Sequence, residues 1–287
     1  MAINIGIVGL PNVGKSTLFN ALSKAGAESA NFPFCTIEPN VGVVAVPDPR
    51  LDALTQIYAS ESTVPASLEF VDIAGLVKGA SQGEGLGNQF LSHIRQVDAV
   101  AHVVRCFVDE NVVHVDGSVD PVRDVEIIDT ELLLADLDTV EKRLERTGKA
   151  AKASGKAGET AKTELAVLEQ LRDHFNRGEP ARTLALTDDD GLIARDLHLL
   201  TRKPVIYIGN VSEEHASDPD QSGPFKALAE LAQRQGAELL AVSAAIEAEV
   251  AELDETEAKE YLDAMGLHEP GLHRVLRAGY ATLGHIT

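Results

Sequence analysis

Eight residues near the start of the chain have the types and spacing that phosphate binding requires. Residues 9–16 are Gly-Leu-Pro-Asn-Val-Gly-Lys-Ser, which matches the pattern GxxxxGK[ST] between an apolar run and an amphipathic segment. At such a strand-to-helix turn, backbone N–H groups converge on phosphate oxygens, and the lysine adds a positive charge. An ordinary glycine-containing turn is the alternative. We expect Lys15 to act in catalysis, and we expect phosphate contacts from Asn12, Val13, Gly14, Lys15, Ser16 and Thr17.

Further side chains extend this site toward a magnesium ion. Asp72 lies at the end of the apolar run 68–73, where a carboxylate can hold Mg²⁺ through a water. The N–H of Gly75 can reach the γ-phosphate, and Thr36 offers a hydroxyl in the loop after the first predicted helix. Oxygen ligands suit Mg²⁺, so we expect Ser16, Thr36 and Asp72 to be its protein ligands. An acid at a strand end is otherwise a common turn residue.

A segment after a later apolar run has the pattern of a purine-binding loop. It has the sequence Asn-Val-Ser-Glu, where GTP-specific P-loop proteins carry Asn-Lys-x-Asp. Val211 replaces the lysine, and Glu213 replaces the aspartate that accepts two hydrogen bonds from guanine, so guanine recognition should be impaired. Asn210 can still bind a purine edge that adenine and guanine share, and Ser243 and Ala244 supply backbone N–H groups near the purine six-position. The alternative is an ordinary loop.

The position that orients the attacking water in many GTPases is aliphatic in this chain. Leu76 occupies the place of the usual glutamine, so another group must hold the water. His114 is the candidate, because it follows the apolar run 99–107, and loops at strand carboxyl ends face the ligand in a doubly wound sheet. His93 is a second choice, and His102 is expected to be packed within the strand. The alternative for His114 is an exposed loop histidine.

A sheet with helices on both faces must position these groups. Apolar runs alternate with helical patterns, which predicts an α/β fold of the P-loop NTPase class with a doubly wound, mainly parallel sheet. Between 129 and 177, two apolar stripes occur without strands, which predicts an inserted, coiled-coil-like α-helical hairpin with its tip in 149–158. The apolar runs are 3–8, 68–73, 99–107, 204–208 and 239–242, and helical patterns lie at 87–96 and 224–235.

Composition limits the classes of function. The chain has 287 residues with 45 Asp+Glu and 25 Lys+Arg, and its net charge of −20 argues against non-specific DNA binding. We expect no membrane association, because no run is long enough to span a bilayer. The chain has two cysteines, too few for a disulfide framework, which fits a reducing cytosol. For the oligomeric state, a monomer is the default expectation. Residues 138–162 carry seven basic and four acidic residues, which predicts either an RNA contact or a solvated helix face.

Four segments together resemble the YchF family of Obg-like P-loop ATPases. They are residues 9–17, 31–40, 72–91 and 210–213, and the resemblance spans essentially the whole chain. It implies ATP binding and slow hydrolysis, weaker GTP binding and Mg²⁺ as cofactor. The cysteine content predicts a cytoplasmic location. The resemblance also implies association with the ribosome, at the large subunit. The basic residues of 138–162 suggest the further hypothesis that the hairpin contacts ribosomal RNA. Relatives of this family continue into a small β-rich TGS domain, which this chain is expected to lack.

The predicted organisation is a nucleotide-binding domain at 1–128 and 190–264. A helical hairpin interrupts it at 129–189, and a helical lead-out follows at 265–287. The expected function is that of a Mg²⁺-dependent nucleotide hydrolase that prefers ATP over GTP and acts as a ribosome-associated, translation-linked switch. Two alternatives stay open: a GTP-preferring regulatory GTPase, and a nucleotide-binding scaffold with negligible hydrolysis. A small-molecule kinase is disfavoured, because no Arg-rich lid replaces the glycine-rich segment after Gly75.

Overall fold

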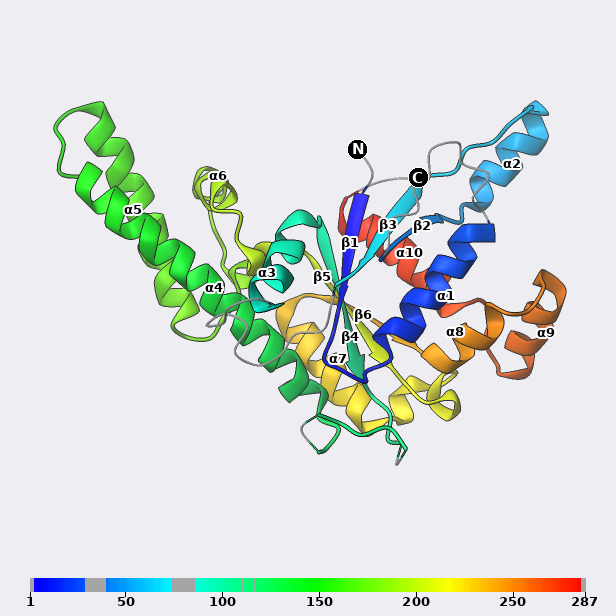
Figure 1. Ribbon diagram of the computed structural model, residues 1–287. Coiled ribbons are helices and arrows are strands. Elements are labelled where there is room, and N and C mark those ends of the chain that lie inside the picture. The colour runs from blue at the N-terminus through cyan, green and yellow to red at the C-terminus, as the bar shows by residue number, and fades with distance from the viewer. Residues whose placement is uncertain (1–2, 29–39, 74–85, 110, 116, 285–287) are drawn as a thin grey trace. The chain divides into compact units, whose positions relative to one another are not determined.

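The computed structural model describes residues 3–28, 40–73, 86–109, 111–115 and 117–284, which fall into two compact units. Unit 1 takes its residues from 1–75, 97–124 and 204–287, and unit 2 takes them from 76–96 and 125–203. Unit 1 holds a β-sheet, and the elements of unit 2 are helical (Figure 1). The segment predicted as a helical insertion lies within the range of unit 2.

A six-stranded sheet is the framework of unit 1. Its order is β2-β3-β1-β4-β5-β6, and the neighbouring strands are parallel except for β2 with β3. Parallel strands are covered on both faces, which is why they appear in the sequence as continuous apolar runs. The predicted doubly wound, mainly parallel fold is therefore confirmed. The strands are β1 (Ile3–Val8), β2 (Val41–Ala45), β3 (Ser67–Asp72), β4 (Ala99–Arg105), β5 (Val205–Asn210) and β6 (Glu238–Val242).

Helices cover both faces of this sheet. Ile5 faces α10 (Gly271–Thr282), and a Cβ on Gly279 of that helix would lie only 2.5 Å from Ile5 Cδ1. Gly209 points to the opposite face by strand alternation, where it meets Phe225 of α7 (Gly223–Gln235). The helix α1 (Lys15–Glu28) packs along β1, β2 and β3. The carboxyl ends of the five parallel strands therefore lie at one edge of the sheet, between these helical layers.

Among the strands and α-helices of unit 1, the sequence patterns do not predict β2, α2 (Pro49–Tyr58), α8 (Ala244–Val250) and α9 (Glu255–Ala264). The strand β2 is a short edge strand interrupted by Gly42, and α8 spans seven residues, so neither gives a long periodic signal. The predicted lead-out contains α10, which packs on the sheet with Val275 and Leu276 buried. This helix belongs to the core of unit 1, because its apolar stripe covers an open face of the sheet.

Unit 2 is organised around a helical hairpin formed by α4 (Pro121–Ala150) and α5 (Lys156–Phe175) (Figure 1). The helix α4 begins before the predicted residue 129, because Asp120 accepts a hydrogen bond from the Arg123 N–H and Pro121 favours the first turn. The predicted apolar stripes meet in one core that includes Val140, Leu168 and Leu171. The other elements of this unit are α3 (Leu86–Gln96), η1 (Ala181–Thr183), α6 (Asp188–Asp196) and η2 (Leu200–Arg202).

Helix length and composition also bear on membrane association. Within the described ranges, no helix combines the length and the apolar character that crossing a membrane would need.

Candidate nucleotide-binding site

The predicted phosphate loop joins β1 to α1 at the carboxyl edge of the sheet. Gly9 lies against β4, since a Cβ on it would be 2.6 Å from the carbonyl oxygen of Val103. Gly14 has a φ of +93°, and a Cβ there would collide with Asn210 Nδ2. Glycine alone satisfies these constraints without strain. The first turn of α1 follows directly with Lys15, Ser16 and Thr17, and the N–H groups of a first turn have no partner within their own helix.

Lys15 and Asp72 form an ion pair between the start of α1 and the end of β3. Ile7 of β1 pairs with Asp72 in the sheet, which brings the acid beside the loop that follows β1. The two side chains are 11% and 18% exposed, so both charges are partly desolvated. A lysine and a carboxylate therefore lie side by side where the sequence predicts phosphate and metal binding.

The residues present fit a magnesium–nucleotide complex. The Asp72 carboxylate and the Ser16 hydroxyl are the hard oxygen donors that Mg²⁺ requires, and the Lys15 ammonium suits a phosphate. Gly9 and Gly14 let the loop pack directly against β4 and Asn210, where a Cβ would collide with protein atoms. Two predicted participants, Thr36 and Gly75, lie outside the described residues, as does Leu76, the aliphatic residue at the usual glutamine position.

Asn210 connects two loops at the end of β5. Its amide nitrogen donates to the carbonyl oxygen of Val13 at 2.9 Å, and its amide oxygen accepts from the Ala244 N–H at 2.9 Å. The residue is buried, so both hydrogen bonds are shielded from water. An amide NH₂ group carries two hydrogens, and the bond to Val13 uses one of them. Asn210 thus braces the phosphate loop against the loop after β6, a role that the sequence pattern did not predict.

A cavity of about 700 Å³ lies beside these loops. Its volume is within the range of small-molecule sites. Seven lining residues come from outside the predicted set, and five of these belong to the loop after β4: Phe107, Val108, Asp109, Asn111 and Val112. The predicted residues that line it are Asn12, Gly14, Thr17, Asn210, Val211, Glu213, Ser243 and Ala244. The structure therefore brings together the phosphate-loop and base-loop predictions in a single hollow.

Two polar groups at the base end are available to a ligand. Ser243 is buried, and within the part of the chain that is described its Oγ has no hydrogen-bond partner. A buried hydroxyl without a partner is unfavourable, so a hydrogen bond from a ligand would stabilise it. Glu213 is exposed at the start of η3 (Glu213–His215), whereas Val211 is buried and its N–H donates to the Val242 carbonyl oxygen at 2.9 Å.

Arg105, the last residue of β4, was not predicted as part of the site. It is 1% exposed, and its guanidinium donates hydrogen bonds to main-chain carbonyl oxygens of Phe107, Asp109 and Val112. Burial lowers the pKa of Arg105 from the ordinary arginine value. The available sequence signal is an arginine within the run 99–107, whose other residues are apolar except for His102.

His114 follows in the same loop and is 8% exposed. Its Nε2 lies 2.8 Å from Oδ2 of Asp124, a buried residue in the first turn of α4, so the alternative of an exposed histidine is wrong. The preceding residue contacts the phosphate loop, because Asn12 Nδ2 donates to the Val113 carbonyl oxygen at 3.2 Å. His102 is packed within β4 as predicted, and His93 is exposed on α3.

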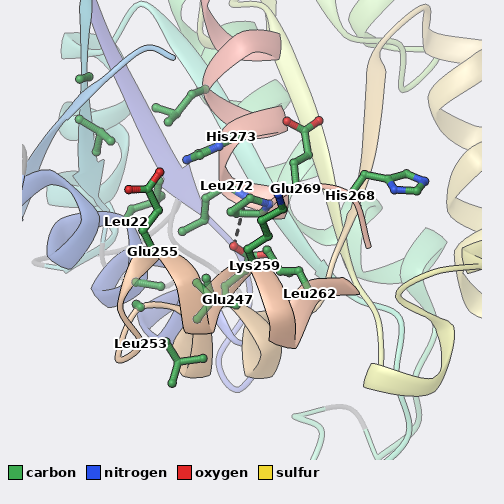
Figure 2. Close-up of a pocket in the computed structure, with 18 of the residues that line it drawn as sticks. Leu22, Glu247, Leu253, Glu255, Lys259, Leu262, His268, Glu269, Leu272 and His273 are labelled. Carbon is green, nitrogen blue, oxygen red and sulfur yellow. Dashed lines mark hydrogen bonds between the residues drawn. The ribbon is translucent and has the colours of Figure 1, made fainter. Parts of the chain in front are cut away.

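A second hollow of about 560 Å³ lies in unit 1 between α1, β2, α8, α9 and α10 (Figure 2). Its lining includes Leu22, Leu262 and Leu272, and none of the residues predicted to bind nucleotide. The Glu247 carboxylate accepts hydrogen bonds from the N–H groups of Gly271 at 2.7 Å and Leu272 at 3.3 Å, which caps the start of α10. This hollow is therefore distinct from the nucleotide cavity, although α8 contributes to the lining of both.

The fold and the site define the class of this chain as an α/β protein with a P-loop nucleotide site. A family model described as "50S ribosome-binding GTPase" matches residues 4–136. "Ribosome-binding ATPase YchF" from Bacillus subtilis (strain 168) is 52% identical over 287 residues, which cover 100% of this chain and 78% of that protein. The protein of that name from Escherichia coli O157:H7 is 54% identical over 284 residues, covering 99% and 76%.

A solved structure agrees with these relatives. The structure of the Schizosaccharomyces pombe YchF GTPase superimposes with a TM-score of 0.87 at 40% identity, covering 98% of this chain and 75% of that one. This chain belongs to the YchF family.

Proposed function

We propose that this chain is a Mg²⁺-dependent nucleotide hydrolase that prefers ATP over GTP. The observation that carries the proposal is the phosphate loop with its Lys15–Asp72 pair, set beside a cavity that the base-loop residues also line. The substrate class is a nucleoside triphosphate, and the reaction is attack of water on the γ-phosphate.

Each part of the site has a role in this reaction. Lys15 and the N–H groups of the loop bind the phosphate oxygens. Ser16, Thr36 and Asp72 would hold Mg²⁺, which when bound would supply positive charge near the γ-phosphate. Phosphoryl transfer needs positioning and charge more than covalent chemistry from the protein, so a side chain that orients water is sufficient.

His114 is our candidate for orienting the water. Asp124 lies 2.8 Å from its Nε2 and fixes the orientation of the ring, and Val113 beside it contacts Asn12 of the phosphate loop. An imidazole held by a carboxylate can accept or donate a hydrogen bond near neutral pH. The support for this role is the place of His114 at the carboxyl edge of the sheet, since Leu76 offers no polar group.

The preference for ATP follows from the base end of the cavity. Glu213 carries the carboxylate one methylene further from the backbone than an aspartate would, which disturbs the paired contact to guanine N1 and N2. The buried Val211 lacks the long stem with which a lysine covers the base. Ser243 adds a hydroxyl that can bond to either purine.

Calorimetric titration with ATP and with GTP tests the base preference. We expect the Kd for ATP to be about tenfold or more below the Kd for GTP. In the Glu213→Asp variant we expect the two Kd values to lie closer together. Glu214→Asp is the matched control, because Glu214 is the exposed neighbour and does not line the cavity. GTP binding tenfold tighter than ATP would favour the GTPase alternative. Nucleotide binding without phosphate release would favour the scaffold.

The proposed partner is the ribosome, at its large subunit. The support is the name of the Bacillus and Escherichia relatives and the description of the matching family model. We place the chain in the cytoplasm for the same reason. The structure places basic residues on the hairpin, which we propose as the contact to ribosomal RNA, and nucleotide binding would act as the switch for this association.

A further inference from the structure

The guanidinium of Arg105 ties together one loop at the carboxyl end of β4. Its Nε donates to the carbonyl oxygen of Phe107 at 3.1 Å, its Nη1 to that of Val112 at 3.0 Å, and its Nη2 to that of Asp109 at 3.3 Å. The guanidinium carbon also lies 4.5 Å from the centroid of the Phe107 ring. A single buried side chain therefore fixes the main chain of this loop at three places.

This loop is one wall of the nucleotide cavity, to which Phe107, Val108, Asp109, Asn111 and Val112 contribute. Its apolar side chains anchor it weakly, because Val108 is 77% exposed and Phe107 and Val112 are only partly buried. A loop with little buried apolar surface opens easily unless other interactions hold it. The hydrogen bonds to Arg105 supply that restraint on the inner side of the wall.

Stability alone does not account for an arginine at this place. Removing a guanidinium from water is costly, and a well-packed apolar side chain of similar size is often equally stabilising or more so. The charges of Asp109 and Asp124 offset part of this cost. The property that an apolar residue or a lysine lacks is a planar fork of donors that can satisfy several carbonyl oxygens at once.

We propose that Arg105 is a positioning residue for nucleoside recognition. It holds the wall formed by residues 107–109, 111 and 112 in the shape that receives the base and sugar, whereas the phosphates are bound by the loop from Gly9 to Thr17. The inference rests on the proposed function, since it takes this cavity as the nucleotide site. Arg105 would thus affect selectivity for the nucleoside through its contacts with the cavity wall, without contacting the nucleotide itself.

Binding of the nucleoside and binding of the phosphates can be measured separately by comparing ATP with inorganic tripolyphosphate, which lacks the base and the sugar. Arg105→Lys keeps the positive charge and removes the planar fork of donors. We expect this variant to raise the Kd for ATP about tenfold or more, with the Kd for tripolyphosphate unchanged within about twofold. Arg202→Lys is the matched control, because Arg202 is partly buried and donates to a carbonyl oxygen, that of Gly191 at 2.9 Å, which does not belong to the cavity wall.

If Arg105→Lys raised the Kd for ATP and for tripolyphosphate equally, or left the Kd for ATP unchanged, the proposed role of Arg105 would be wrong. Arg105→Gln, which keeps two donors and loses the charge, is the second variant, and circular dichroism checks that both variants fold. If neither folds, Arg105 serves stability alone and the proposal is wrong. If the wild-type chain bound tripolyphosphate but not ATP, the proposed function would be wrong. This result concerns the wild type alone, so it can be told apart from a result that contradicts only the role of Arg105.

Discussion

Two pairs of ionisable side chains lie buried or partly buried at the nucleotide site. Lys15 pairs with Asp72, and His114 lies against Asp124. A buried carboxylate without a partner would be strongly unfavourable. Lys15 therefore stabilises Asp72, and His114 stabilises Asp124. Each pair therefore holds a group that takes part in the proposed reaction in a defined position.

The His114 hypothesis gives a prediction for this pair. In His114→Ala we expect turnover of ATP to fall about tenfold or more, because the water loses its orienting group. The Kd for ATP should change little, since His114 does not line the cavity. Phosphate release and calorimetry measure the two effects.

His93→Ala is the control for this experiment, because His93 is exposed on α3 and was the second choice. Turnover of His114→Ala equal to that of the wild type would show that His114 has only a structural role. A loss confined to His93→Ala would move the catalytic assignment to His93.

At the scale of elements, a buried carboxylate joins α4 to the short helix η2. Asp136 accepts hydrogen bonds from the N–H groups of Leu200 and Thr201, both at 2.8 Å, and from the Thr201 hydroxyl at 2.7 Å. Burial raises the pKa of Asp136, and the hydrogen bonds from Thr201 and Leu200 partly oppose this shift. The long helix of the hairpin is therefore attached to the segment that returns to β5.

Removing this carboxylate should destabilise the chain. We expect Asp136→Ala to lower the free energy of unfolding by about 3 kcal/mol, because buried N–H groups lose their acceptor. Asp138→Ala on the same helix is the control, since Asp138 is exposed beside Lys142 and such pairs contribute at most about 1 kcal/mol. Chemical denaturation followed by circular dichroism measures both. Equal effects would mean that the cap does not stabilise the hairpin.

Sequence patterns predict elements best where burial is uniform and long. Strands β1, β3, β4, β5 and β6 are apolar runs because both of their faces are covered, whereas β2 is a short edge strand and α8 is a short helix. The phosphate loop is predictable because its glycines are fixed by backbone geometry. Arg105 is not, because an arginine at the end of a strand is as consistent with exposure as with burial until the loop that folds over it is known.

Charge is unevenly distributed over the whole molecule. The chain carries a net charge of −20, while the hairpin segment 138–162 has more basic than acidic residues. Some of its basic residues pair on the hairpin itself, as Lys142 does with Asp138 and Lys149 with Glu145. Within the described chain, Lys152 and Lys156 have no such ion pair and are exposed. These two lysines are therefore the best test of an RNA contact.

Ribosome co-sedimentation provides that test. We expect the double variant Lys152→Glu, Lys156→Glu to bind ribosomes less tightly and to show a smaller dependence on salt, because fewer phosphates are neutralised. The double variant Lys226→Glu, Lys259→Glu changes the net charge equally on exposed helix positions of unit 1 and is the control. Co-sedimentation equal to the wild type would identify the basic arm as a solvated surface with local ion pairs.

The brace formed by Asn210 has a consequence for how substitutions combine. Asn210 is 197 residues from Val13 in sequence, yet its amide binds that residue and also occupies the space into which a Cβ on Gly14 would project. Positions in direct contact do not contribute additively to stability. A side chain at position 14 would clash less once Asn210 is shortened, leaving mainly the strain of its positive φ. Substitutions at positions 14 and 210 are thus epistatic: the effect of each on stability depends on which residue occupies the other position.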